Sequence, residues 1–180
     1  MSRTKKALKG WLPFAVVGTA AVVLIYVGIQ QDMRQTANDP QIRMAEDGAA
    51  ALKNGSSTKS VIFPGSVDLS TSLDPFMIIL NDAGEVLASS ASLNGSTPTL
   101  PKGVLDTART KGENRLTWQP QDGVRLATIV TYQDGKQPGF VVVGRSLREV
   151  EKREKQLAVM AAADLVGLLG ASYIAVLLTL

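Results

Sequence analysis

DPFMIILNDAGEVLASS, residues 74–90, is the stretch of sequence that decides the fold. Its apolar run, residues 75–80, is typical of a short strand that is covered on both faces. The tetrapeptide at 81–84, Asn-Asp-Ala-Gly, is a strong turn signal, and residues 85–89 follow as a second strand. The stretch therefore predicts a β-hairpin at the centre of the chain.

The segment after the hairpin predicts a short helix and three more strands. Residues 90–100 are expected to form a loop, and residues 101–111 a helix that turns Val104, Leu105 and Ala108 inward before Gly112. Three strands follow at 114–119, 124–133 and 139–144, separated by turn signals at 121–123 and 134–135. With the hairpin, these strands predict a five-stranded antiparallel sheet in an α+β domain.

A helix is also expected before the hairpin. Asp39 is a suitable N-cap and Pro40 a suitable first helical residue, and Asn54-Gly55 ends the pattern. The apolar residues between them recur at helical spacing: Ile42, Ala45, Ala49 and Leu52. Residues 55–60 are small and polar, which predicts a loop.

The last helix is expected to start at Ser146. Ser146 and Glu149 match a capping box, and no glycine or proline interrupts the run to Val166. The sequence therefore predicts one helix that leaves the central domain and continues into the second apolar segment.

Two apolar segments flank the central domain. Trp11 to Ile29 carries no charge, and Leu157 to Leu180 carries one, Asp164. About 20 such residues suffice to cross a bilayer as a helix. We therefore expect a two-pass membrane protein with a basic tail at 1–10, a first span at 11–30, a central domain at 31–156 and a second span at 157–180.

The charge pattern predicts the orientation of the spans. Arg3, Lys5, Lys6 and Lys9 precede the first span without an acidic residue, which favours a cytoplasmic N-terminus and an extracytoplasmic central domain in the plasma membrane. The alternative is a cleaved signal peptide, against which the first span is long and residues 28–31 lack a small-residue cleavage site. Basic residues between Arg145 and Lys155 oppose this orientation, but acidic residues are interleaved with them.

Residues 74–90 and 139–147, in this order of elements, resemble the single-Cache and PAS-like extracytoplasmic domains of bacterial sensor kinases and chemoreceptors. The resemblance covers roughly residues 39–156 and the placement of both spans. It implies a five-stranded antiparallel sheet with a long N-terminal helix, and a role in ligand binding and signal transduction. Those receptors continue into a cytoplasmic output domain, whereas this sequence stops at Leu180.

Composition excludes several kinds of chemistry. The chain has no cysteine and no histidine, so it holds no Cys/His zinc site and no histidine-dependent nucleophile. A Ser-x-x-Lys match at 56–59 lacks its companion motifs and is better explained as a polar loop. We therefore expect no enzyme activity, no metal and no cofactor. The net charge of +3 comes from the N-terminal tail, so no nucleic-acid partner is expected.

The candidate ligand site lies on the last three strands. Trp118, Arg125 and Tyr132 are their large polar-tipped side chains, with Arg109 and Arg115 nearby in sequence. An arginine beside aromatic rings suits a small carboxylate ligand. The alternative is that the two rings belong to the core and Arg125 forms a structural ion pair.

The second span carries two features that point to a membrane partner. Its small residues form a ridge at every fourth position, which favours close helix packing against the first span or another chain: Ala163, Gly167, Ala171 and Ala175. Asp164 is either an intramembrane functional carboxylate or a residue near the membrane surface that water solvates.

These features lead to two functional hypotheses. The first is a membrane-anchored extracytoplasmic sensory or ligand-binding module that signals through its second span, alone, as a homodimer or with another membrane signalling protein. The alternative is a non-catalytic assembly or regulatory subunit that binds no small ligand. A pocket lined by polar groups favours the first, and one filled with apolar side chains favours the second.

Overall fold

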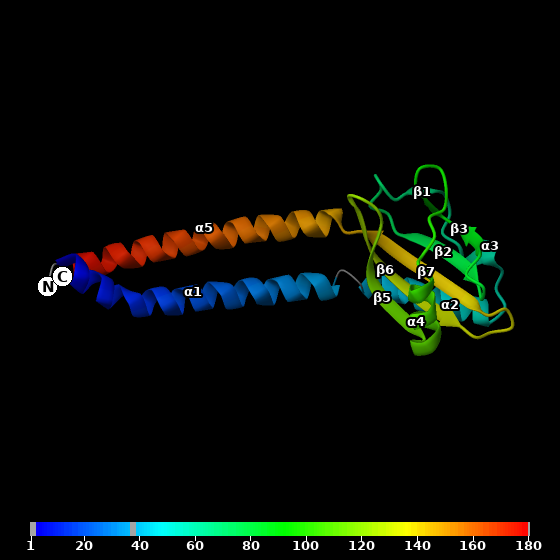
Figure 1. The fold of residues 1–180 in the computed structure, drawn as a ribbon, viewed down its shortest axis with the longest axis horizontal. Helices are drawn as coiled ribbons and strands as arrows, with labels where there is room; N and C mark the ends of the chain where they lie inside the picture. Colours follow the sequence, from blue (N-terminus) through cyan, green and yellow to red (C-terminus); the bar gives the residue numbers. More distant parts are fainter. Residues whose placement is uncertain (1–2, 37–38, 180) are drawn as a thin grey trace. The chain divides into compact units, whose positions relative to one another are not determined.

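The computed structural model describes residues 3–36 and 39–179 of the chain. These residues divide into two compact units, the helix pair (up to Gln35 and from Val150 onward) and the central domain (Thr36–Glu149). Figure 1 shows the elements of both in chain order. The expected arrangement of an α+β domain between two long terminal helices is confirmed.

The central domain is built on a five-stranded antiparallel sheet. Its strands are β2 (Phe76–Asn81), β3 (Val86–Ser89), β5 (Glu113–Gln121), β6 (Val124–Gln133) and β7 (Gly139–Ser146). The strand order is β3-β2-β7-β6-β5. The hairpin predicted at 74–90 is therefore present, and the last strand in sequence is inserted at the middle of the sheet.

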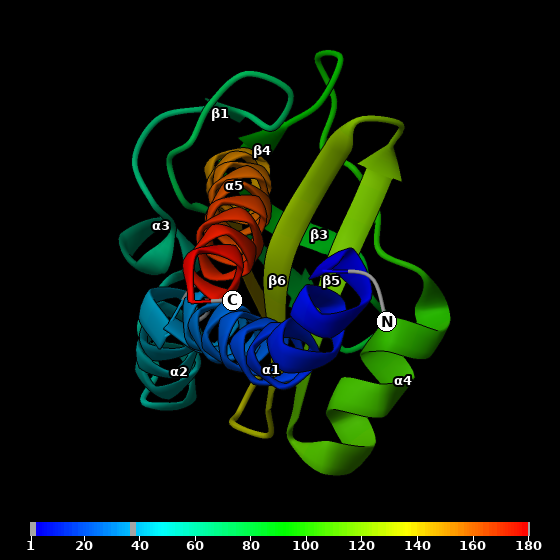
Figure 2. The same cartoon turned by 90° about the vertical axis from the view of Figure 1, so that its left-hand side faces the viewer.

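The side chains of the sheet alternate between two faces, as the pleat requires. On β2, β5, β6 and β7, the face covered by α4 (Lys102–Lys111), here the α4 face, carries even-numbered residues, among them Phe76, Trp118 and Phe140. The face covered by α2 (Asp39–Lys53), here the α2 face, carries odd-numbered ones, among them Met77 and Val141. Figure 2 shows α2 and α4 on opposite sides of β5 and β6. The domain therefore has two separate apolar cores, one on each face.

Two short elements lie where the sequence predicts loops, and a third lies in a segment for which it makes no prediction. Helix α3 (Thr58–Val61) begins within the expected loop at 55–60, with Ser57 Oγ accepting a hydrogen bond from the Ser60 amide at 3.2 Å. Strands β1 (Val67–Asp68) and β4 (Ala91–Ser92) pair in parallel, and β4 lies within the expected loop at 90–100. The loop predictions are wrong at these points because tertiary contacts, with Leu69 and Ala91 in the core of the α4 face, fix segments that carry no periodic pattern.

The start of the last helix differs from the expected position, and the predicted break before the second helix lies partly outside the described residues. Helix α5 (Arg148–Leu178) begins two residues after the predicted Ser146. Ser146 instead ends β7, opposite Leu126, and its Oγ accepts from the Arg148 amide at 3.3 Å, so it does not form the predicted capping box. The predicted break at 38–40 falls partly on residues 37–38, which lie outside the described residues.

The helix pair consists of α1 (Arg3–Thr36) and α5, and each is long and apolar enough to cross a membrane. The two helices run side by side in opposite directions (Figure 1). Trp11 Nε1 donates to Ser172 Oγ at 2.8 Å, and the Trp11 ring meets Tyr173 edge-on at 5.6 Å. A Cβ on Gly18 would lie 2.4 Å from Leu168 Cδ2, so glycine allows the close approach there. This arrangement is compatible with a two-pass membrane protein.

Candidate functional site

The candidate site begins at the turn between β2 and β3. Asn81 shapes this turn, because its Oδ1 accepts from the Glu85 amide at 2.8 Å and its Nδ2 donates to Glu85 Oε2 at 2.7 Å. Gly84 has a φ of +87°, and a Cβ there would lie 2.9 Å from Leu105 of α4. Glycine thus lets the turn approach α4 closely, which brings Asp82 to the surface of that helix.

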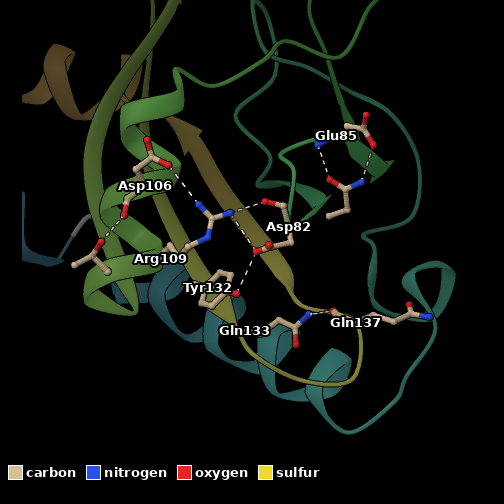
Figure 3. A network of polar contacts seen from close by, with 9 residues as sticks. Asp82, Glu85, Asp106, Arg109, Tyr132, Gln133 and Gln137 are labelled. Carbon is tan, nitrogen blue, oxygen red and sulfur yellow. Dashed lines mark hydrogen bonds and ion pairs between the residues drawn. The ribbon is translucent and has the colours of Figure 1, made fainter.

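Arg109 of α4 connects the helix to this turn. Its Nη2 donates to the Asp82 carbonyl and lies 3.1 Å from Asp82 Oδ1, and its Nη1 lies 3.3 Å from Asp106 Oδ1. The same Asp82 carboxylate oxygen accepts from the Tyr132 hydroxyl at 3.1 Å. Figure 3 shows these groups converging from α4, the turn and the end of β6. The network therefore joins three elements that are far apart in sequence.

Two aromatic rings support the Arg109 guanidinium. Its central carbon lies 5.0 Å from the centroid of the Phe140 ring and 5.6 Å from that of Tyr132, within range of cation–π attraction. The hydrogen bond to Asp82 raises the pKa of Arg109, partial desolvation opposes this, and the charge of Asp82 adds to the rise. Arg109 is therefore a fixed cation that lies over the exposed edge of the α4 face.

A surface depression of about 250 Å³ adjoins this network. Its lining combines charged and apolar residues: Asp82, Ala83, Lys102, Leu105, Asp106 and Arg109. Arg109 is engaged by the two aspartates, whereas no partner is seen for the Lys102 ammonium among the described residues. The depression offers a free cation beside an apolar wall, in a volume suited to a small polar molecule.

The structure places the three predicted ligand residues in different surroundings. Tyr132 belongs to the Asp82–Arg109 network. Trp118 is buried in the core of the α4 face, where its ring lies 6.4 Å from that of Phe76. The expectation that Trp118 and Tyr132 line one open site is therefore not met.

Arg125 lies on the other side of the sheet. It is seven residues before Tyr132 on β6, so the alternation of the strand turns the two side chains to opposite faces. Its side chain is exposed, and its carbonyl accepts from the Leu147 amide at 2.9 Å. Arg115, named with it, is also exposed and is paired with Glu113. Because Arg125 and Tyr132 are an odd number of residues apart on β6, the predicted grouping of Arg125 with Trp118 and Tyr132 is not formed.

Two features of the described helix pair bear on a membrane partner, an apolar gap between the helices and an exposed row of small residues. The gap, of about 300 Å³, is lined by Val22, Val23, Tyr26, Ala158, Ala161, Ala162 and Leu165, which provide no charged group. The predicted small-residue ridge is exposed along its whole length: Ala163, Gly167, Ala171 and Ala175. The α5 residues that meet α1, such as Leu168 and Ser172, belong to another stripe, so the first span does not cover the ridge.

No group of three or more acidic side chains among residues 3–36 and 39–179 is arranged to hold a metal ion. A scan against protein-family models found no matching family, and a search of curated proteins found no matching relative. The interpretation of the site therefore depends on its geometry alone.

Proposed function

We propose that the chain is a membrane-anchored sensory module that binds a small carboxylate in the Lys102–Arg109 depression and signals through its second span. The resemblance of its elements to single-Cache and PAS-like domains supports this proposal, as does the placement of the central domain between two apolar helices. The proposal includes that both apolar helices cross the bilayer, that the N-terminus lies in the cytoplasm and that the central domain lies outside the cytoplasm.

The observation that carries the proposal is the charge arrangement of the depression. A polar-lined pocket distinguishes a sensor from a subunit that binds no ligand, and four of the six residues that line this depression are charged. Lys102 binds the incoming carboxylate, and Leu105 contacts its apolar part. The bound carboxylate then competes with Asp82 and Asp106 for Arg109, which loosens the connection between α4 and the turn.

Strand β7 provides a route from the site to the second span. It begins at Gly139 and Phe140, beside the ring contacts of Arg109, and it ends at Ser146, two residues before α5. Hydrogen bonds to β2 and β6 hold it on both sides, so it moves as part of a stiff sheet. A shift of Arg109 therefore reaches α5 through one continuous strand.

The ligand proposal is tested by thermal shift on the full chain in detergent with acetate, lactate, succinate and citrate. At least one of these should stabilise the wild type. Lys102→Ala should weaken its binding by about 10- to 150-fold, the range of a hydrogen bond to a charged group. Lys111→Ala is the matched control, because Lys111 lies at the other end of α4 and does not line the depression. Stabilisation that survives Lys102→Ala, or no stabilisation by any of the four, contradicts the proposal.

The orientation is tested by reporter fusions. A reporter inserted at Gly95, in an exposed loop of the central domain, and one fused after Leu180 should report opposite sides of the membrane. Both reporters on one side would contradict the two-span arrangement.

A further inference from the structure

Asp164 is a charged residue on an exposed part of α5. Its side chain is exposed in the helix pair, and it forms no hydrogen bond or ion pair with any residue that the structure describes. Asp164 lies at the edge of the face that α5 turns towards α1, four residues before Leu168, yet its own side chain remains exposed there. Because the side chain is exposed, the carboxylate of Asp164 is open to whatever surrounds the helix pair.

The pairing of the two helices places Asp164 near the middle of the apolar layer. Gly18 of α1 lies opposite Leu168, and Trp11 lies opposite Ser172, so the antiparallel helices put Asp164 at the level of residues 20–22. These residues are the centre of the charge-free run from 11 to 29. At 1.5 Å per residue, Asp164 also lies about 13 Å beyond Lys155 along the helix. This depth favours the intramembrane alternative over a position at the membrane surface.

The chain has no cation of its own at this depth. Residues 11–29 and 157–180 contain no lysine, arginine or histidine. A second copy packed in parallel would bring only another carboxylate to the same level, and two like charges repel strongly where water is absent. Charge complementarity therefore requires a cation from a different chain.

The surroundings of Asp164 allow another helix to approach closely. Gly167 and Ala171 follow it by three and seven residues, which places them on nearly the same side of the helix. A Cβ built on Gly167 meets no atom within 4 Å. A neighbouring helix can thus bring a side chain to the Asp164 carboxylate without displacing large residues.

We propose that Asp164 pairs with a lysine or arginine near the centre of a transmembrane helix of another protein. The small residues beside Asp164 form the contact surface for that helix. The proposal depends on the membrane insertion of α1 and α5 that the proposed function includes, and it does not depend on ligand binding by the central domain.

The test measures association of the full chain with synthetic transmembrane helices in phosphatidylcholine vesicles. The probe is a Leu/Ala helix about 24 residues long with one central lysine, and the matched probe has leucine at that position. Because the chain has no cysteine, a cysteine introduced by Leu178→Cys gives a single site for a fluorescent label. Energy transfer should show about 3- to 30-fold tighter association with the lysine helix.

Three variants assign this preference to Asp164. Asp164→Asn should remove most of the preference for lysine, and Gly167→Leu should weaken association with the lysine helix by blocking its approach. Val166→Leu is the matched control, because Val166 is an exposed residue of the same turn that points away from Asp164. It should leave the association unchanged.

Four outcomes overturn the proposal. The first two are equal association with both probes and a preference for lysine that survives Asp164→Asn. The third is energy transfer between two labelled copies of the chain that the lysine helix does not reduce. The fourth is release of the wild type from membranes by alkaline carbonate. Release by carbonate also overturns the membrane part of the proposed function. Retention in the membrane with no preference for lysine overturns the Asp164 pairing alone.

Discussion

The two faces of the central sheet are covered in different ways. On the α2 face, the small residues Ala45, Gly48 and Ala49 let a helix of 15 residues lie close against the strands. On the α4 face, a helix of 10 residues buries only Leu105 and Ala108. Large rings and the segment that carries β1 and β4 fill the remaining space there.

The difference explains why the candidate site lies where it does. The long helix closes the α2 face with apolar contacts, whereas α4 leaves the edge of its face to be covered by a charged side chain. Arg109 lies over the Phe140 ring at that edge, and a cation in this position needs the acidic partners that the neighbouring turn supplies. A polar site thus forms at the point where the apolar cover of the sheet ends.

The largest effect is expected from Phe140→Ala on the α4 face. Phe140 is fully buried, and loss of such a ring costs about 3–5 kcal/mol of unfolding free energy. Denaturant unfolding followed by Trp118 fluorescence, in a background of Trp11→Phe, measures this change for the central domain. A loss below about 1 kcal/mol would mean that the ring is not part of a close-packed core.

A smaller effect is expected from Gly48→Leu on the α2 face. A Cβ at Gly48 would lie 3.2 Å from both Met77 Cε and Val141 Cγ1, so a larger side chain overpacks the interface and costs about 1–3 kcal/mol. The matched control is Gly103→Leu in α4, where nothing lies within 4 Å and the helix gains up to about 1 kcal/mol in propensity. Equal changes in unfolding free energy for the two substitutions would contradict the close packing of α2 on its face of the sheet.

Tyr132→Phe tests the polar edge of the α4 face. It removes the hydroxyl that donates to Asp82 and keeps the ring beneath Arg109, so the expected cost is about 0.5–1.5 kcal/mol. Because the Asp82 side chain is half exposed, water replaces part of the lost bond and the value should fall at the lower end. A cost as large as that of Phe140→Ala would contradict the assignment of Tyr132 to a solvated edge.

The smallest effect concerns stability in acid. It rests on two exposed carboxyls with lowered pKa values, Asp68 beside the α4 face and Asp134 beside the α2 face. Hydrogen bonds from the Ser70 side chain and amide lower the pKa of Asp68, and the hydrogen bond and charge of Lys53 lower that of Asp134. A carboxyl with a lowered folded-state pKa contributes stability above its unfolded pKa, here near 3.8, and loses it as the pH falls through the folded value. Stability should therefore decline below about pH 4.

Two variants separate these carboxyls. Asp68→Asn and Asp134→Asn should each reduce the loss of Tm between about pH 6 and about pH 3. Because salt screens an exposed ion pair, high salt should weaken the contribution of Asp134 more than that of Asp68. An identical response of both variants to salt would contradict the two different causes.

Much of the sheet could be predicted because its strands are bounded by turn residues. The turns at 81–84, 121–123 and 134–135 mark the ends of β2, β5 and β6 within one or two residues. Helix α3 and the β1–β4 pair could not be predicted, because two- and four-residue elements form only when their segments pack on a core that distant residues build.

The candidate site could be predicted only in part. Tyr132 was identifiable as a large polar-tipped residue near the end of a strand, and the alternation along β6 was a sufficient signal to separate it from Arg125. The Arg109–Asp82 contact spans 27 residues of sequence and depends on how closely Gly84 lets the turn approach α4. No local pattern encodes that distance, so the network becomes visible only in the folded domain.

The position of β7 has a consequence for how the chain is made. β7 is the last strand to leave the ribosome, and it separates two hairpins, β2–β3 and β5–β6, that have no contact through the sheet without it. Until Gly139 to Ser146 has been synthesised, each hairpin exposes a strand edge that can pair with another chain. Folding of the central domain is therefore a late event, which cannot be completed before β7 has emerged.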